Sequence, residues 1–241
     1  MLYPADFERA TLASWLPRER AEMFGWTLQA TDGCSRRINE VWPLSWTGET
    51  DLNTAIAQAE DWLRARGLTP CFKIAEGLTQ PPGLASALAA RGYAPIAPTL
   101  VMTARLSASP PQDGVTLEMS PSEAFFAPLR EGASTADSEE RRGALLRMPS
   151  PRIFAATPRA DAVGACAITG AIASIYAMRT RSDARRKGLA RSVLRALTGW
   201  AHAQGAATAC FQVEDSSTPA IALYEKAGFS PLYRYVHWRA K

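Results

Sequence analysis

The second half of the chain has an apolar pattern that predicts one amphipathic helix among several short strands. In residues 188–203, apolar side chains recur mainly at spacings of three and four, which places them on one face of a helix. That face is formed by Leu189, Val193, Leu194, Leu197 and Trp200. Short apolar runs bounded by turn residues are typical of strands. They occur at Arg152–Ala156, Val163–Ile168, Ala171–Thr180 and Ala209–Val213. We therefore predict three consecutive antiparallel strands, then the helix and a further strand.

The first half of the chain repeats this order of elements. Three blocks align: Trp62–Gly67 with Trp200–Gly205, Cys71–Ile74 with Cys210–Val213, and Leu88–Tyr93 with Tyr224–Phe229. Together they predict a helix, a short strand, a second helix and an aromatic residue that opens another strand. A glycine follows each predicted helix, as is favoured where a helix ends in a left-handed residue. These glycines are Gly67, Gly92, Gly205 and Gly228. We infer the duplication of one α/β unit.

The run Ser107–Gly114 predicts a linker between the two copies. Pro110 and Pro111 cannot continue a helix or a central strand, and Asp113 with Gly114 favours a turn. We therefore expect an N-terminal domain at 1–106, a linker at 107–114 and a C-terminal domain at 115–241.

Composition excludes several classes of protein. Of 241 residues, 47% are hydrophobic and 21% are charged, as in ordinary globular proteins. No apolar run approaches the roughly 18 residues of a membrane span, and the first 20 residues lack the apolar centre of a signal peptide. We expect a cytoplasmic protein without membrane contact. The four widely spaced cysteines, with only two histidines, predict reduced and mostly buried thiols and no metal site.

Positive charge is concentrated in one segment. Residues 141–195 hold twelve Lys and Arg against two acids, Asp161 and Asp183, although the whole chain carries a net charge of only +4. Such a segment suits an anionic partner, and nucleic acid, acidic lipid and a phosphorylated cofactor all qualify on charge.

The connection between a strand and the predicted helix contains Arg185, Gly188 and Ala190, at the spacing (Q/R)-x-x-G-x-(G/A). This spacing resembles the acyl-CoA motif of the GCN5-related N-acetyltransferase (GNAT) family. The segment Ala222–Phe229 is similar to the later A-x-x-x-Y-x-x-x-G-F element. Both occur in the family's order, and the resemblance extends over roughly 153–239. It implies an α/β (α+β) fold of two tandem GNAT-like units, each with a mixed, mostly antiparallel sheet flanked by helices.

The resemblance also implies acetyl-CoA as co-substrate and places its contacts. The pantetheine arm would pair with the end of the preceding strand, and the pyrophosphate would lie on the amides of residues 186–191. The expected cofactor contacts are Met178, Arg179, Thr180, Arg185, Arg186, Lys187, Gly188, Leu189, Ala190, Arg191 and Ser217. The chain departs from the family at Ser217, where asparagine is common, and at Ser182, where proline is usual.

For catalysis, the resemblance implies that Tyr224 protonates the departing thiolate. The sequence identifies a general base less clearly. Glu214 and Asp215, just after a predicted strand, are candidates, and solvated turn acids are the alternative. Further acids are expected to border the acceptor cleft or to recognise a cationic substrate; they are Glu123, Glu131, Asp137, Glu139 and Glu140.

The N-terminal copy lacks the residues that the motif requires. Leu88 stands where the second copy has Tyr224, and Thr47–Leu52, with Glu49 and Asp51, stands where the basic loop would be. We expect a degenerate copy that serves as structure or as a wall of the acceptor cleft. The segment Cys34–Leu44 predicts an edge strand with a packed Trp42, or alternatively a substrate-recognition element.

Function is thus expected to be acetyl transfer to a primary amine of a small molecule or a peptide N-terminus. The alternatives are a non-catalytic acyl-CoA-binding or interaction module and an aminoacyl-tRNA-dependent transferase. An intact acyl-CoA loop argues against the last of these and against nucleic acid as partner. A homodimer is compatible with all three interpretations.

Overall fold

The computed structural model describes residues 2–241, which divide into two compact units. The unit built mostly from the second half contains residues 2–15, 102–213 and 217–231 and is called the C-half unit. The other contains residues 16–101, 214–216 and 232–241 and is called the N-half unit. The α/β class expected from the sequence is confirmed.

The C-half unit has a mixed sheet in the order β5-β10-β9-β8-β7-β6. β7 and β8, and β8 and β9, are antiparallel neighbours, whereas β9 and β10 are parallel. This confirms the predicted order of three antiparallel strands, helix and further strand. The strands are β5 (Ala94–Arg105), which continues from the N-half unit, β6 (Thr116–Glu118), β7 (Arg152–Ala156), β8 (Ala162–Thr169), β9 (Ile172–Thr180) and β10 (Thr208–Glu214).

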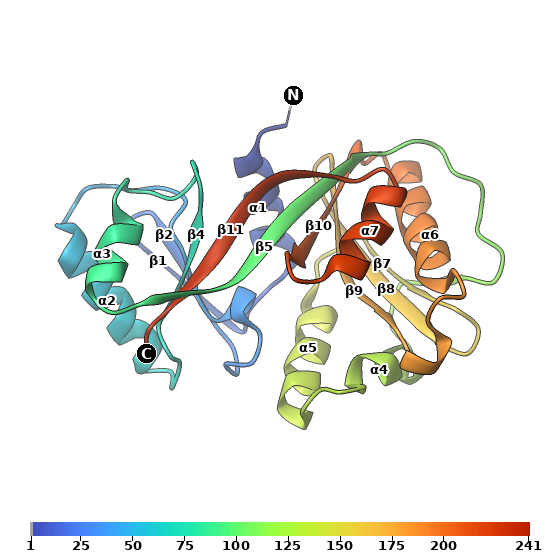
Figure 1. Ribbon diagram of the computed structural model, residues 1–241, viewed down its shortest axis with the longest axis horizontal. Coiled ribbons are helices and arrows are strands. Elements are labelled where there is room, and N and C mark those ends of the chain that lie inside the picture. Colours follow the sequence, from blue (N-terminus) through green and yellow to red (C-terminus); the bar gives the residue numbers. More distant parts are fainter. Residues whose placement is uncertain (1) are drawn as a thin grey trace. The chain divides into compact units, whose positions relative to one another are not determined.

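Helices flank this sheet (Figure 1). They are α1 (Pro4–Ser14), α4 (Glu123–Arg130), α5 (Thr135–Arg147), α6 (Leu189–Ala203) and α7 (Thr218–Lys226). α6 is the predicted amphipathic helix: it packs on β7, β8 and β9 and buries Val193, Leu194 and Leu197. Gly164 on β8 permits this approach, because a Cβ there would lie 3.0 Å from side-chain carbons of both Val193 and Leu197.

The N-half unit has strands in the order β1-β2-β3-β4-β11-β5. Its other elements are β1 (Glu19–Met23), β2 (Trp26–Ala30), β3 (Val41–Trp42), β4 (Cys71–Ala75), β11 (Ser230–Arg239), α2 (Leu52–Arg64) and α3 (Leu84–Ala90). α2 and α3 cover one face of these strands, where Ile56, Leu63, Phe72, Leu84 and Leu88 form a buried core (Figure 1).

The repeat seen in the sequence reappears as repeated structure. α2, β4 and α3 follow one another as α6, β10 and α7 do, and both series begin after a strand that is parallel to the next one. The predicted left-handed glycines are also confirmed. Gly67, Gly92, Gly205 and Gly228 have φ of 71°, 83°, 90° and 88°.

The boundaries of the two compact units differ from those of the expected domains. The reason is that the first helix and most of the last strand each belong to the unit built mostly from the other half of the chain. Helix α1 belongs to the C-half unit, where Ser14 Oγ lies 2.7 Å from the Tyr176 hydroxyl and Trp15 stacks on Tyr176 at 4.7 Å. Most of β11 belongs to the N-half unit and pairs antiparallel with β4. Residues 107–114 lie within the C-half unit, where Pro110, Pro111 and Trp200 line one cavity.

The segment Cys34–Leu44 is not an edge strand. It forms a 3-10 turn at Arg36–Ile38 and the two-residue strand β3, which lies between β2 and β4. Trp42 is buried, as expected. Within residues 2–241 the four cysteines form no disulfide, and three of them, Cys71, Cys166 and Cys210, are buried, as expected of mostly buried thiols. Among the described residues, no helix has both the length and the apolar character needed to cross a membrane.

Candidate active site

The start of α6 presents backbone N–H groups that no protein group accepts. Gly188 is the N-cap residue and has φ of +79°, a left-handed conformation that favours glycine. Within residues 2–241, the amides of Gly188, Leu189 and Ala190 donate no hydrogen bond, whereas those of Arg191 and Ser192 donate to the Gly188 carbonyl. Free amides at the positive end of a helix dipole form an anion-binding site.

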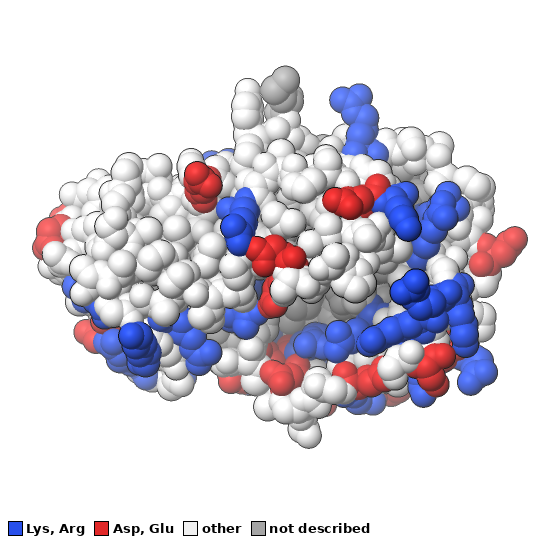
Figure 2. Space-filling view, in the orientation of Figure 1, with Lys and Arg blue, Asp and Glu red and all other residues white. Residues whose placement is uncertain are grey.

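Basic side chains surround these amides. Arg185, Arg186 and Lys187 are exposed in the loop before α6, and Figure 2 shows Lys and Arg gathered on this side of the C-half unit. A Cβ placed on Gly188 would meet no heavy atom within 4 Å, so the space before the amides is open. Open amides and cationic side chains together suit a phosphorylated ligand.

Glu131 holds the start of this loop. Its carboxylate accepts hydrogen bonds from the Ser182 amide, at 3.0 Å, and from the Ser182 hydroxyl. These bonds, followed by the charges of Arg185 and Arg181, lower the pKa of Glu131. From the sequence, Glu131 was predicted to border the acceptor cleft or to recognise a cationic substrate. Its hydrogen-bond partner in the structure is the serine that replaces the family's usual proline. A proline has no amide to donate, and here the Glu131 carboxylate fixes the turn.

The end of β9 has an unpaired edge. β9 pairs with β10 only from Ile172 to Ser174, and within residues 2–241 no strand pairs with Met178–Thr180 on that side. Their other edge continues to pair with β8 as far as Thr180, past a bulge where Ala177 has φ of +53°. Met178, Arg179 and Thr180 lie on this segment. An extended ligand carrying amide groups could add to such an edge as a strand would.

Tyr224 lies on α7 with its ring buried. The ring stacks on Phe211 at a centroid distance of 3.9 Å and meets the edge of Phe229 at 5.7 Å. Burial raises the pKa of Tyr224, so the phenol keeps its proton at neutral pH. Within residues 2–241, no protein group forms a hydrogen bond with its hydroxyl. Ser217, half-buried, is the N-cap residue of α7 and makes no side-chain cap bond.

Three of the predicted acids form ion pairs. At the end of β10, Glu214 pairs with Arg36, and the next residue, Asp215, pairs with Arg234. Arg142 and Arg130 bind the Glu123 carboxylate, and the bond from Arg142 contributes most to lowering the pKa of Glu123. Other acids lie on α5: Asp137 in its first turn, Glu139 exposed and Glu140 buried.

Comparisons with known proteins bear on this arrangement. Residues 5–238 match the model of a family described as "Probable histone acetyltransferase Rv0428c C-terminal". The chain is also 30% identical to "Uncharacterized N-acetyltransferase YobR" of Bacillus subtilis, over 97% of each chain. The chain belongs to this N-acetyltransferase family. It is therefore an enzyme of the GNAT type, which confirms the expectation from its two motifs.

Solved structures share the GNAT fold. A GCN5-related N-acetyltransferase from Kribbella flavida matches with a TM-score of 0.72 and 17% identity, over 99% of this chain and 96% of that one. A tandem GNAT protein from the clavulanic acid biosynthesis pathway matches with a TM-score of 0.61 and 17% identity, over 94% of this chain and 84% of that one.

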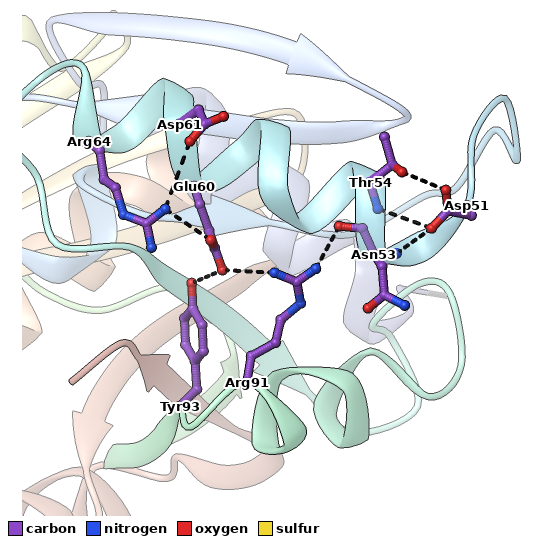
Figure 3. A network of polar contacts seen from close by, with 8 residues as sticks. All are labelled: Asp51, Asn53, Thr54, Glu60, Asp61, Arg64, Arg91 and Tyr93. Atoms are coloured by element: carbon purple, nitrogen blue, oxygen red, sulfur yellow. Dashed lines mark hydrogen bonds and ion pairs between the residues drawn. The ribbon is translucent and has the colours of Figure 1, made fainter.

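In this GNAT chain, the start of α2 differs chemically from the start of α6. Asp51 is the N-cap residue of α2, and its carboxylate accepts from the amides of Asn53 at 2.9 Å and Thr54 at 3.1 Å (Figure 3). The Thr54 hydroxyl also donates to it and contributes most to lowering the pKa of Asp51. Two helix-start amides are thus already occupied by a negative charge.

Around α2, further polar contacts join the helix to its neighbours. Glu60 accepts from the Tyr93 hydroxyl at 2.9 Å and forms ion pairs with Arg64 and Arg91 (Figure 3). Leu88, the counterpart of Tyr224, is buried in the N-half core. These contacts stabilise the N-half unit.

Proposed function

We propose that this enzyme transfers the acetyl group of acetyl-CoA to a primary amine of a small molecule or a peptide N-terminus, by direct attack in a ternary complex. One observation carries the proposal: the amides of Gly188, Leu189 and Ala190 are open and lie beside three basic side chains. Acetyl-CoA carries a pyrophosphate that such a site recognises, and its thioester supplies an activated acetyl group.

Three groups of residues would hold acetyl-CoA. The amides from Arg186 to Ala190 would bind the pyrophosphate, with Arg185, Arg186 and Lys187 balancing its charge. The Arg191 amide, also expected there, donates to the Gly188 carbonyl instead. The free edge of Met178–Thr180 would hydrogen-bond to the amides of the pantetheine arm. Ser217, whose hydroxyl makes no cap bond, is available to hydrogen-bond to the arm.

Tyr224 and Glu214 are the proposed acid and base. Tyr224 is protonated at neutral pH and its hydroxyl has no protein partner, so it can donate a proton to the departing thiolate. An amine must lose a proton before or during attack, and Glu214 is 43% exposed at the end of β10. Its ion pair with Arg36 fixes the position of this carboxylate.

The N-half unit is proposed to bind no acetyl-CoA. Asp51 occupies the amides at the start of α2, and its negative charge would repel a phosphate. Leu88 has no hydroxyl to replace that of Tyr224. This copy is therefore assigned a structural role in a tandem GNAT protein.

A thiol-release assay tests this function. The purified chain is incubated with acetyl-CoA and one member of a panel of amines, polyamines, amino acids and peptides, and the acetylated product is identified by mass spectrometry. At least one amine should be acetylated in step with CoA release. CoA release without an acetylated amine, or no release with any panel member by a chain that binds acetyl-CoA, would contradict the proposal.

A further inference from the structure

Three side chains that commonly bind metals meet in the N-half unit. Glu40 directly precedes β3, Cys71 begins β4 and His237 lies on β11. They lie on the sheet face opposite α2 and α3, since Val41 and Phe72, which pair between β3 and β4, point into the helix-covered core. The three ligand atoms lie within 4.8 Å of one another, and all three residues are buried.

The two oxygens of the Glu40 carboxylate differ in their hydrogen-bond partners. Its Oε2 atom lies 2.5 Å from Nδ1 of His237 and 3.8 Å from the Cys71 sulfur, whose thiol donates to it. Its Oε1 atom is buried and, within residues 2–241, has no hydrogen-bond partner. A buried carboxylate oxygen without a partner is costly. A cation bound to this carboxylate would offset that cost.

We propose that Glu40, Cys71 and His237 form a binding site for a divalent transition-metal ion, best suited to Zn²⁺. A carboxylate, a thiolate and an imidazole are all zinc ligands, and a set that includes a thiolate does not suit Mg²⁺ or Ca²⁺. The cluster is also poorly arranged as a cysteine nucleophile, because the Cys71 thiol points to Glu40 and not to an imidazole base.

Binding of the ion balances protons and charge. Cys71 releases its thiol proton to solvent, and His237 binds through Nδ1 as the tautomer that carries its proton on Nε2, so that a carboxylate, a thiolate and a neutral imidazole face the ion. The ligated centre then has no net charge. Buried Lys73, the strand neighbour of His237, lies between the rings of Trp42 and Tyr235, with its Nζ atom 3.7 Å and 3.9 Å from the ring centroids.

A cavity of about 280 Å³ gives access to the site. Cys71 is part of its lining, together with Asn39, Cys34 and the cationic side chains of Arg36 and Arg239. Three protein ligands leave one tetrahedral position open. Water or a small anion from this cavity would fill it. The cavity is lined by an acid, Asp32, as well as by the two guanidinium groups, and Arg36 also pairs with Glu214.

Cobalt titration of the full chain tests the site. Co²⁺ bound to a thiolate gives a sulfur-to-metal charge-transfer band in the near ultraviolet, which needs no enzyme activity to observe. We expect the band to saturate at one Co²⁺ per chain, to disappear when Zn²⁺ displaces Co²⁺, and the melting temperature of the metal-stripped chain to rise with added Zn²⁺.

Two matched variants identify the ligands. Cys71→Ser should lose the band and weaken Zn²⁺ binding by more than about 100-fold, the upper range for losing even an outer partner of a metal ligand. Cys34→Ser, which alters the same cavity outside the cluster, should keep both. A band that survives Cys71→Ser overturns the proposal. If Cys71→Ser does not fold, the natural chain decides: absence of both the band and the Zn²⁺-dependent rise in melting temperature also overturns it.

Discussion

Gly188 and Gly205 lie at opposite ends of α6 and provide a matched test of the phosphate site. Both have left-handed backbones, with φ of 79° and 90°, and a Cβ at either position would meet no atom within 4 Å. Gly188→Val and Gly205→Val therefore introduce the same side chain and a similar backbone strain. Only Gly188→Val places carbon atoms in front of the open amides.

The two variants should lose similar stability but differ in acetyl-CoA affinity. A non-glycine residue in this conformation lowers the free energy of unfolding by about 1–2 kcal/mol. In a domain of this size, each kcal/mol lowers the melting temperature by roughly 2–4 °C. Hydrogen bonds to a charged group contribute about 1.5–3 kcal/mol each. Loss of one amide–phosphate bond in Gly188→Val therefore weakens binding about 10- to 150-fold.

Calorimetric titration with acetyl-CoA and thermal unfolding of each variant make the comparison. We expect both melting temperatures to fall by similar amounts and the dissociation constant to rise for Gly188→Val alone. A folded Gly188→Val chain with the affinity of the natural chain would refute the assignment of these amides to the pyrophosphate. An equal loss of affinity in Gly205→Val would show that strain, and not blocked access, is the cause.

Three further changes test other parts of the structure. Tyr224→Phe should lower kcat by about 10²–10⁴, the usual contribution of general acid catalysis, with acetyl-CoA affinity unchanged; full kcat in a steady-state assay would remove Tyr224 from the mechanism. Trp15→Ala should destabilise the C-half unit by about 3 kcal/mol in urea unfolding and speed hydrogen exchange in β8 and β9, because Trp15 is buried against Tyr176; faster exchange confined to the N-half unit would contradict the place of α1. Glu131→Gln should lower the melting temperature above about pH 4.3, the ordinary glutamate pKa. The pKa of Glu131 is lowered in the folded chain. The difference in melting temperature between the natural chain and Glu131→Gln should therefore vanish as pH falls through that lowered pKa. A difference that stays constant with pH would count against the Ser182 contact.

Local patterns in the sequence predicted the elements that pack against their own neighbours. The apolar period of residues 188–203 locates α6 because one face of that helix is buried on the sheet. Four glycines mark helix ends because a left-handed residue is needed there. The loop before α6 is recognisable because its glycine and basic residues are adjacent in the chain.

Contacts between distant residues could not be predicted in this way. Ser14 meets Tyr176 and β11 pairs with β4, although no local period specifies which strand or helix accepts a terminal segment. Segment 34–44 was expected to be an edge strand because it is polar, strand-like and rich in Arg and Trp, but only Val41 and Trp42 form a strand. The Glu131 contact with Ser182 likewise joins two loops, each of which has an ordinary polar sequence.

At the proposed metal site, the three ligands lie far apart in the sequence and lack any ligand spacing such as C-x-x-C. The parallel pairing of β3 with β4 places Glu40 and Cys71 side by side, and His237 lies on β11, which pairs with β4. Sequence reasoning therefore expected no metal site. Only the strand order of the N-half unit places a carboxylate, a thiol and an imidazole on one sheet face.

The stoichiometry of acetyl-CoA binding to the full chain is the most direct measurement of how the two copies divide their roles. Isothermal titration calorimetry should give one site per chain, since the amides at the start of α6 are open and two of those at the start of α2 are held by Asp51. Two equivalent sites would contradict a degenerate N-terminal copy. No binding by the folded chain would contradict acetyl-CoA as the co-substrate.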